Sequence, residues 1–251
     1  MTSKSSAIEI SPASLGARER LIVALDVAKA GDAQALVSQV GDSAGIFKVG
    51  LQLFTSEGPE IVRDLVASGR KVFLDLKLHD IPNTVKNAVK AAVELRASML
   101  TLHASGGPSM LKAAAEVASD RLTLLAVTVL TSMNDEELSQ VGVAGRVLDQ
   151  ALRMAELARS AGCTGVVASA RESTQLRKFL GEGFAIVNPG VRPAGAALND
   201  QQRVATPTEA INAGASHIVV GRPITQAPDP AKAAQAIVSE MEQALALKAR
   251  S

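Results

Sequence analysis

The segment 72–84, VFLDLKLHDIPNT, contains the residues whose types and spacing best fit a catalytic role. Asp75 and Lys77 are two positions apart, and Asp80 follows three positions later. Residues two apart on a β-strand point to the same face, and buried charges are rarely stable unless they are paired. We therefore expect Asp75, Lys77, Asp80 and Lys48 to form one network. An ammonium held among carboxylates can stabilise a developing negative charge and then donate a proton.

Further residues lie in or just after the apolar runs and extend the candidate site: Asp26, Lys48, Thr131, Ser132, Arg192, Gly221 and Arg222. Gly221 would allow the backbone to approach an anion closely, and Arg222 could bind two phosphate oxygens. The stretch Gly190–Gln202 is rich in Gly, Pro and Ala and is expected to be a lid or binding loop. Without a phosphate site, the charges of Asp75 and Lys77 would also fit a purely structural ion pair.

Metal and cofactor motifs are not apparent. The three histidines, His79, His103 and His217, are not closely paired, and the single cysteine, Cys163, cannot complete a zinc set. We assign none of the histidines as a ligand or general base. Residues 105–107, SGG, are predicted to turn into a helix, since neither a Rossmann nor a P-loop pattern is present. We expect no metal and no cofactor.

The elements that must position these side chains are predicted from eight apolar or β-branched runs, most of them followed by apolar residues at helical spacing. The predicted strands are Leu21–Val27, Gly45–Gly50, Lys71–Lys77, Met99–Ser105, Thr123–Leu130, Gly165–Ala170, Ala185–Asn188 and His217–Gly221. The predicted helices are Asp32–Val40, Pro59–Ala67, Thr84–Leu95, Ser109–Ala118, Leu148–Ala161, Glu172–Leu180, Thr208–Ala213 and Pro230–Leu247.

This alternation predicts an α/β protein with a single (β/α)8 TIM barrel, although an open doubly wound sheet gives a similar pattern. Val72, Leu74 and Leu76 should face the helices, and Asp75 and Lys77 the barrel interior. In such barrels the active site lies at the carboxyl ends of the strands. The polar residues that follow the apolar runs would therefore meet at one end of the barrel.

Length and composition bound the remaining possibilities. The 251 residues fit one domain, with residues 21–251 forming the barrel and residues 1–20 a flexible or loosely docked leader that has no apolar stretch of a signal or membrane span. With 26 basic and 25 acidic residues, no overall charge attracts nucleic acid or a membrane, so the expected partner is a small molecule. One cysteine cannot form an intramolecular disulfide, which suits the cytoplasm.

Taken in order, seven segments resemble the bacterial type of the orotidine 5'-phosphate decarboxylase family: LIVALDV, FKVG, VFLDLKLHDIPNT, LTLHASGG, AVTVLTS, NPGVRP and VVGRPIT. The resemblance spans Leu21 to about Pro230. The DxKxxD motif alone is shared with related phosphate-binding barrels, but the ordered set is highly specific. One departure is Asn188, which stands where many relatives have Thr and puts fine substrate positioning in doubt.

The resemblance implies a role for each matching residue. Lys77 would be the proton donor, Lys48 and Asp75 would flank the reacting carbon and the ribose hydroxyls, and Asp80 would complete the catalytic set. Asp80 and Thr84 would reach into the partner's site of a homodimer. The implied substrate-binding residues are Asp26, Lys48, Asp75, Ile81, Thr84, Thr131, Ser132, Pro189, Arg192, Gln201, Gly221 and Arg222. Either Thr131 or Ser132 would hold the pyrimidine.

The implied reaction is the decarboxylation of orotidine 5'-phosphate to uridine 5'-phosphate in de novo pyrimidine biosynthesis, without a metal. Loss of carbon dioxide leaves electron density on pyrimidine carbon six, which Lys77 would stabilise and protonate. One rival is a magnesium-dependent sugar-phosphate decarboxylase or aldolase, but such relatives usually have a metal-binding Glu where this chain has Lys48. Another is a catalytically silent phosphate-binding barrel that acts as a regulator or scaffold.

Overall fold

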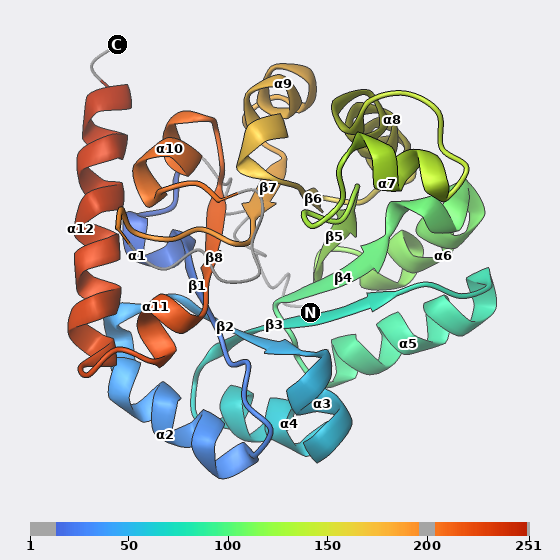
Figure 1. Cartoon of the computed structure of the whole chain (residues 1–251). Coiled ribbons are helices and arrows are strands. Elements are labelled where there is room, and N and C mark those ends of the chain that lie inside the picture. Colours follow the sequence, from blue (N-terminus) through green and yellow to red (C-terminus); the bar gives the residue numbers. More distant parts are fainter. Residues whose placement is uncertain (1–13, 196–203, 250–251) are drawn as a thin grey trace, which may run out of the picture.

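Eight parallel strands form a closed barrel in the computed structural model, which describes residues 14–195 and 204–249 (Figure 1). The strands are β1 (Leu21–Ala24), β2 (Ile46–Gly50), β3 (Lys71–Leu78), β4 (Met99–His103), β5 (Thr123–Val127), β6 (Gly165–Val167), β7 (Ala185–Asn188) and β8 (His217–Val220). Neighbours in sequence are neighbours in the sheet, and β8 pairs with β1. This closure confirms the (β/α)8 barrel and excludes the open sheet.

The predicted helices surround the barrel, each within two residues of its predicted bounds: α2 (Ala30–Val40), α4 (Glu60–Ala67), α5 (Pro82–Glu94), α6 (Gly107–Ala118), α8 (Val147–Ser160), α9 (Ala170–Leu180), α10 (Pro207–Asn212) and α12 (Pro230–Lys248). Four short helices were not predicted: α1 (Ala17–Arg20), α3 (Leu51–Glu57), α7 (Asp135–Gln140) and α11 (Arg222–Thr225). Segments of four to seven residues are too short to show helical periodicity. Within the described ranges, no helix is long and apolar enough to cross a membrane.

Several strands end earlier than predicted. The prediction Gly165–Ala170 is wrong at its end, because β6 stops at Val167 and Ala170 already belongs to α9. The side chain of Ser169 accepts a hydrogen bond from the N–H of Arg171, and the Glu172 carboxylate accepts one from the N–H of Ser169. This capping box begins the helix at once.

The barrel interior has an apolar layer below a polar one. Ile46, Phe73 and Met99 belong to the interior apolar cluster. Two residues further along the same strands, on the same face, are Lys48, Asp75 and Thr101. On the opposite face of β3, Val72 and Leu74 are buried in the core between barrel and helices, and Leu76 packs against it, as predicted.

A short helix, α1, precedes the first strand of the barrel, which begins at Leu21. Helix α1 packs beneath the barrel, where Arg20 is only 6% exposed. Its Nε atom donates to the carbonyl oxygen of Leu15 at 2.9 Å, and its Nη1 atom to that of Ser216 at 3.3 Å. Residues 17–20 are therefore part of the folded domain, whereas residues 1–13 of the predicted leader lie outside the described part.

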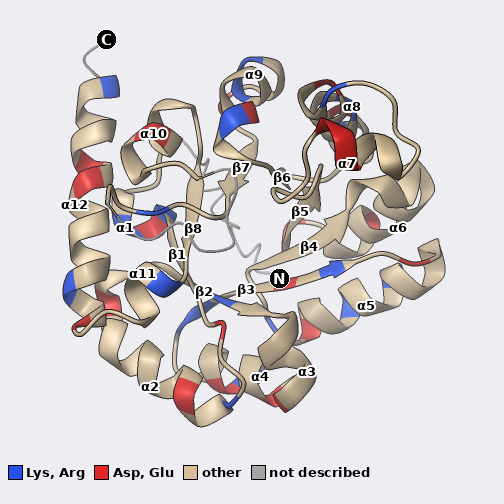
Figure 2. Ribbon diagram, viewed as in Figure 1, with Lys and Arg blue, Asp and Glu red and all other residues tan. Residues whose placement is uncertain are grey.

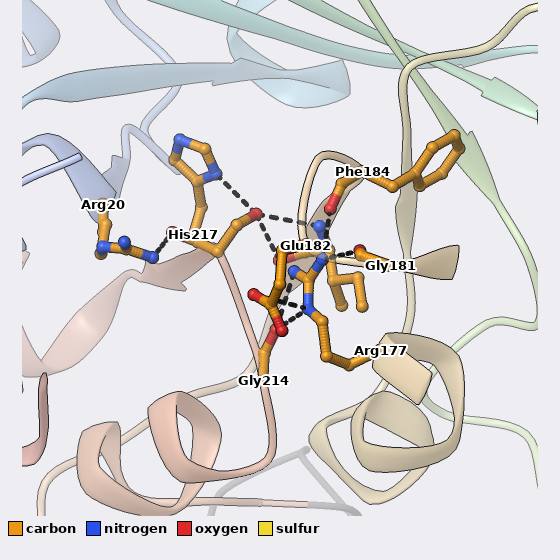
Figure 3. A network of polar contacts seen from close by, with 9 residues as sticks. Arg20, Arg177, Gly181, Glu182, Phe184, Gly214 and His217 are labelled. Carbon is orange, nitrogen blue, oxygen red and sulfur yellow. Dashed lines mark hydrogen bonds and ion pairs between the residues drawn. The ribbon is translucent and has the colours of Figure 1, made fainter. Parts of the chain in front are cut away.

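A second polar network occupies the amino-terminal end of the barrel, opposite the strand ends predicted to form the site (Figure 3). Arg177 of α9 donates to the carbonyl oxygens of Phe184 at 2.8 Å and of Gly214 at 2.9 and 3.0 Å. These contacts join the segments that precede β7 and β8. A pocket of about 210 Å³ opens beside Arg20 and Arg177. Polar residues at this end of a TIM barrel serve stability.

Two titratable groups are buried in the scaffold. The ring of His217, at the start of β8, has its Nδ1 atom 3.0 Å from Ser216 Oγ. Burial and the nearby charges of Arg20 and Lys71 lower the pKa of His217 to about 3. Cys163 is a free, buried thiol, and burial raises its pKa to about 12. At neutral pH both groups are therefore uncharged.

Candidate active site

Two lysines and two aspartates meet at the carboxyl ends of β1, β2 and β3. Lys48 Nζ donates to Asp26 Oδ1 at 3.0 Å and lies 3.7 Å from Asp75 Oδ2. Lys77 Nζ donates to Asp75 Oδ1 at 2.8 Å. The predicted pairing of Asp75 with both lysines is present, and Asp26 joins the same network. Asp75 thus holds two ammonium groups at one point of the barrel mouth.

The position of Asp75 keeps its carboxylate ionised. Its side chain is 13% exposed, and burial by itself raises its pKa. The charges of Lys48 and Lys77 outweigh that effect, helped by hydrogen bonds from Lys77 and Thr101, so the pKa of Asp75 lies below its ordinary value. The side chain of Lys77 is 30% exposed and so remains accessible to a substrate.

Strand β3 is irregular where it carries the charged motif. Its pairing with β4 is regular through Leu74 and resumes only at Leu78, so β3 contains extra residues between these points. Lys77 lies in this bulge with a φ of 49°, a left-handed conformation that a residue with a Cβ rarely adopts. Asp75 and Lys77 point to the same side, as predicted. They do so because of the bulge, and not because of the alternation of a regular strand.

Thr101 of β4 stabilises this bulge and was missed by sequence reasoning. Its Oγ1 atom accepts a hydrogen bond from the backbone N–H of Lys77 at 2.9 Å and donates to Asp75 Oδ1 at 2.9 Å. A threonine in a strand is ordinary, so its type carried no signal. Its position two residues after an interior residue, level with Asp75, was the available clue.

Gly50 leaves room for the charged groups, and Gly221 lies beside them. A Cβ atom at Gly50, the last residue of β2, would lie 2.8 Å from Lys48 Nζ and displace the ammonium. A Cβ at Gly221 would lie 3.5 Å from Asp26 Oδ2, an ordinary van der Waals contact, so the predicted close approach of its backbone to an anion stays a prediction. Gly50 was not singled out from the sequence, although it follows Lys48 by two residues.

Asp80, Ile81 and Thr84 point away from the cluster. The side chain of Asp80 is exposed, and its Oδ1 atom accepts a hydrogen bond from the N–H of Ile81 at 2.6 Å. Ile81 is 67% exposed, and Thr84, in the first turn of α5, is also exposed. The prediction that Asp80 joins the network is therefore wrong within one chain. The reason is geometric, since β3 has ended and the chain turns outward into α5.

The remaining predicted residues follow β5, β7 and β8 at the same end of the barrel. Thr131 is partly buried and Ser132 exposed, both beyond the observed end of β5 at Val127. Thr128, directly after β5, instead donates through Oγ1 to the carbonyl oxygen of Val167 at 3.1 Å. The predicted strand end at Leu130 placed Thr131 and Ser132 too close to the sheet.

The arginines predicted to bind phosphate follow β7 and β8. Pro189 follows β7 directly, and Arg192 is buried, with its backbone N–H donating to the carbonyl oxygen of Ala205 at 3.0 Å. Arg222 is the first residue of α11, directly after Gly221. Gln201 and most of the predicted loop Gly190–Gln202 lie outside the described residues.

Asn188, the departure from the family pattern, is fully buried beside α9. Its Nδ2 atom donates to the carbonyl oxygen of Ala168 at 2.8 Å and to Ser173 Oγ at 2.9 Å. These contacts join β7 to the segment that follows β6 and to the first turns of α9. Asn188 therefore acts in packing, away from the charged cluster.

The donor set does not favour a hard cation. No group of three or more His, Cys, Asp or Glu side chains within residues 14–195 and 204–249 is arranged to hold a metal ion. Lys48 Nζ lies between the carboxylates of Asp26 and Asp75, where its charge would repel a cation.

On the outer helices, acidic and basic residues are interspersed in the view of Figure 2.

Comparison with known proteins gives a consistent result. Residues 19–237 match the family described as orotidine 5'-phosphate decarboxylase / HUMPS. Proteins named orotidine 5'-phosphate decarboxylase from Sodalis glossinidius and Halorhodospira halophila are 49% and 51% identical to this chain. The alignments cover 95% of both chains for the first, and 90% of this chain and 97% of the relative for the second.

A solved structure agrees with these relatives. The crystal structure of orotidine 5'-phosphate decarboxylase from Lactobacillus acidophilus superimposes with a TM-score of 0.80 at 39% identity, covering 88% of this chain and 98% of that one. Family match, relatives and fold all extend over nearly the whole barrel. The chain belongs to the orotidine 5'-phosphate decarboxylase / HUMPS family.

Proposed function

We propose that this enzyme converts orotidine 5'-phosphate to uridine 5'-phosphate and carbon dioxide, a step of pyrimidine biosynthesis, without a metal ion. The observation that carries the proposal is the contact of Asp75 with both Lys77 and Lys48, at 2.8 and 3.7 Å. Among family members with a DxKxxD motif, a lysine at position 48 favours the decarboxylase over the metal-dependent aldolase or sugar-phosphate decarboxylase.

The proposed chemistry depends on the ammonium groups of Lys77 and Lys48, which Asp75 holds in place before the substrate reacts. The bond between pyrimidine carbon six and the substrate carboxylate breaks, carbon dioxide leaves, and the electron pair stays on carbon six. The ammonium of Lys77 stabilises this pair and then transfers a proton from Nζ to the carbon, giving the product. Asp75 holds Lys77 in place, and its lowered pKa keeps it an anion throughout the neutral range.

Substrate binding is assigned to the rest of the barrel mouth. Asp26 would contact the ribose or the base, and Lys48 and Asp75 would flank the reacting carbon and the ribose hydroxyls. Thr131 or Ser132 would contact the pyrimidine. The phosphate would lie by the loops after β7 and β8, near the residues Pro189, Arg192, Gln201, Gly221 and Arg222. Closure of the loop 190–202 over the phosphate would exclude water from carbon six, so that binding energy far from carbon six contributes to catalysis.

The proposed working unit is a homodimer in the cytoplasm. The support is the outward course of residues 80–84, which leaves Asp80 and Thr84 exposed and Ile81 67% exposed beside the barrel mouth. An apolar side chain this exposed next to charged groups fits a contact with another subunit. Asp80 and Thr84 would then complete the partner's site, and the cluster seen in one chain would be incomplete alone.

The test is an assay of orotidine 5'-phosphate consumption before and after exhaustive chelation. We expect turnover to be unchanged by chelation, because the lysine ammonium groups supply the positive charge. Loss of turnover that magnesium restores would overturn the metal-free mechanism. A folded protein that consumes no orotidine 5'-phosphate under either condition would overturn the function itself and favour the silent phosphate-binding barrel.

A further inference from the structure

The mechanism leaves two residues at the barrel mouth without a role: His79 and His103. Their ring centroids are 5.4 Å apart and their planes are tilted by 40°. Leu78, the last residue of β3, pairs with Leu102 of β4, so His79 directly follows β3 beside His103, the last residue of β4. Their ring contact continues the pairing of the two strands just past the irregular part of β3.

The position of this ring contact matters because of the bulge before it. Lys77 has its left-handed backbone held on one side by the hydrogen bond from its N–H to Thr101 Oγ1. The pairing of His79 with His103 lies on the other side of Lys77. Thr101 and His103 are two apart on β4 and so share a face. Strand β4 therefore contacts the chain on both sides of Lys77, through Thr101 and through His103.

The His79 side chain is exposed, but one edge of its ring lies near the segment that follows β4. A Cβ atom added at Gly106 would lie 3.2 Å from His79 Cδ2 and 2.2 Å from the sulfur of Met110, which is fully buried. The His79 ring thus packs near the Gly106 backbone on one side and has His103 as a ring neighbour. Lys77 precedes His79 by two residues and Asp80 follows it directly, so the ring contact lies between the two residues assigned to the reaction.

The charges near His103 favour an uncharged ring. Burial lowers the pKa of His103, as do the nearby His79 and Lys77, while Asp75 acts in the opposite direction and does not compensate. A protonated His103 would place a second cation beside Lys77 and a charge against the His79 ring. Repulsion between this charge and the Lys77 ammonium would loosen the segment from Lys77 to Asp80.

We propose that His103, through its contact with His79, is a positioning residue that holds the segment 77–80, and with it Lys77 and Asp80, in the reactive arrangement. This inference rests on the proposed function, since it assigns Lys77 and Asp80 their roles in decarboxylation. Because a charge on the His103 ring would disturb this contact, the inference predicts that protonation of His103 lowers kcat without removing the phosphate contacts of the substrate.

The experiment compares His103→Ala, which removes the ring, with His103→Phe, which keeps a ring that cannot be protonated. We expect His103→Ala to lower kcat at pH 8 at least about tenfold while KM changes less than about threefold, the pattern for loss of an interaction made only in the transition state. His103→Phe should recover most of that loss. His103→Gln serves as the second non-ionising variant should the larger ring disturb folding.

The pH profile separates positioning from simple packing. Because a phosphate also titrates near pH 6, profiles of wild type and His103→Phe are compared with the same substrate between pH 5 and 8. The ratio of wild-type to His103→Phe kcat should fall as pH decreases. NMR titration of the ring protons, simple in a chain with three histidines, should place the His103 midpoint at the same pH as this fall.

The opposing outcomes are distinct. A kcat for His103→Ala within threefold of wild type, or a pH-independent ratio of wild-type to His103→Phe kcat, would overturn the inference while leaving decarboxylation intact. Failure of the wild-type protein to turn over orotidine 5'-phosphate would instead overturn the proposed function.

Discussion

The Nζ atom of Lys77 and the Oδ1 atom of Asp75 lie 2.8 Å apart, although Lys77 has a left-handed backbone that interrupts the regular strand. A residue with a Cβ in that conformation costs about 1–2 kcal/mol, so the fold stabilises it through other contacts. Thr101 provides one of them, by accepting from the Lys77 N–H. Strained backbone conformations cluster at functional sites, so the left-handed conformation of Lys77 at its contact with Asp75 fits a catalytic role of this residue.

Lys77→Ala should nearly abolish turnover while uridine 5'-phosphate still binds, because Lys77 is proposed to act on charge that develops only in the transition state. The measurements are kcat and the product Kd. Lys71→Ala is the matched control, since Lys71 is an exposed lysine at the opposite end of β3. Turnover of Lys77→Ala within about tenfold of wild type, a loss of only about 1.4 kcal/mol, would contradict the assigned role.

Lys77→Ala and Asp80→Ala should complement each other in mixed dimers. One site of such a dimer would have its own Lys77 and an intact Asp80 from the partner, while the other site would lack both groups. After the two variants are unfolded and refolded together in equal amounts, half the dimers are mixed and about one quarter of all sites are complete. Specific activity should rise to about that fraction of wild type.

The control for complementation is each variant refolded alone, with subunit exchange verified by a mass tag. No gain on co-refolding, despite exchange, would mean that Asp80 serves its own barrel. The exposed position of Asp80, with the backbone N–H of Ile81 as a partner, would then be its working position.

Arg222→Ala should weaken transition-state binding of the phosphorylated substrate by several kcal/mol, as expected when a charge-assisted contact in a desolvated site is lost. The unphosphorylated nucleoside should lose far less, because it cannot make the contact. The measurement is kcat/KM for both substrates with wild type and variant. Equal losses for the two substrates would remove Arg222 from the phosphate site.

His217 should make the protein less stable in mild acid. Its folded pKa of about 3 lies below the unfolded value of about 6.5, so the unfolded state binds the proton more tightly. Its contribution is constant above about pH 6.5, and each unit below that costs about 1.4 kcal/mol until pH approaches 3. Asp75, whose pKa is also lowered, loses its contribution only below about pH 4. Between pH 6.5 and 5 the loss from His217 should be about 2 kcal/mol.

Urea unfolding at pH 7.5 and pH 5 measures this loss. His217→Gln cannot be protonated and should show a smaller difference between the two pH values, whatever its absolute stability. Lys112→Gln, at an exposed position of α6, should keep the wild-type difference. A wild-type pH dependence preserved in His217→Gln would show that another group is responsible.

Sequence reasoning predicted the barrel and the residues with unusual chemistry, because alternating apolar runs and charges at strand ends are both legible in the sequence. It missed what depends on tertiary contacts. Thr101 is an ordinary strand residue until it is placed beside Asp75, and the bulge at Lys77 exists only relative to the register of β4. Asp80 was grouped with the cluster because of its spacing from Lys77, although the resemblance also implied that it reaches a partner's site, and within one chain it is exposed.

The inert thiol of Cys163 makes the chain convenient for site-directed labelling. With a pKa of about 12, on the order of one thiol in 10⁵ is ionised at pH 7, and the side chain is also shielded from reagents. A cysteine introduced at an exposed position away from the barrel mouth, such as Val141 on the α7 side, would therefore take up a maleimide dye almost alone. Two dyes in one assembly would then report subunit separation and exchange by energy transfer, with no native cysteine to remove.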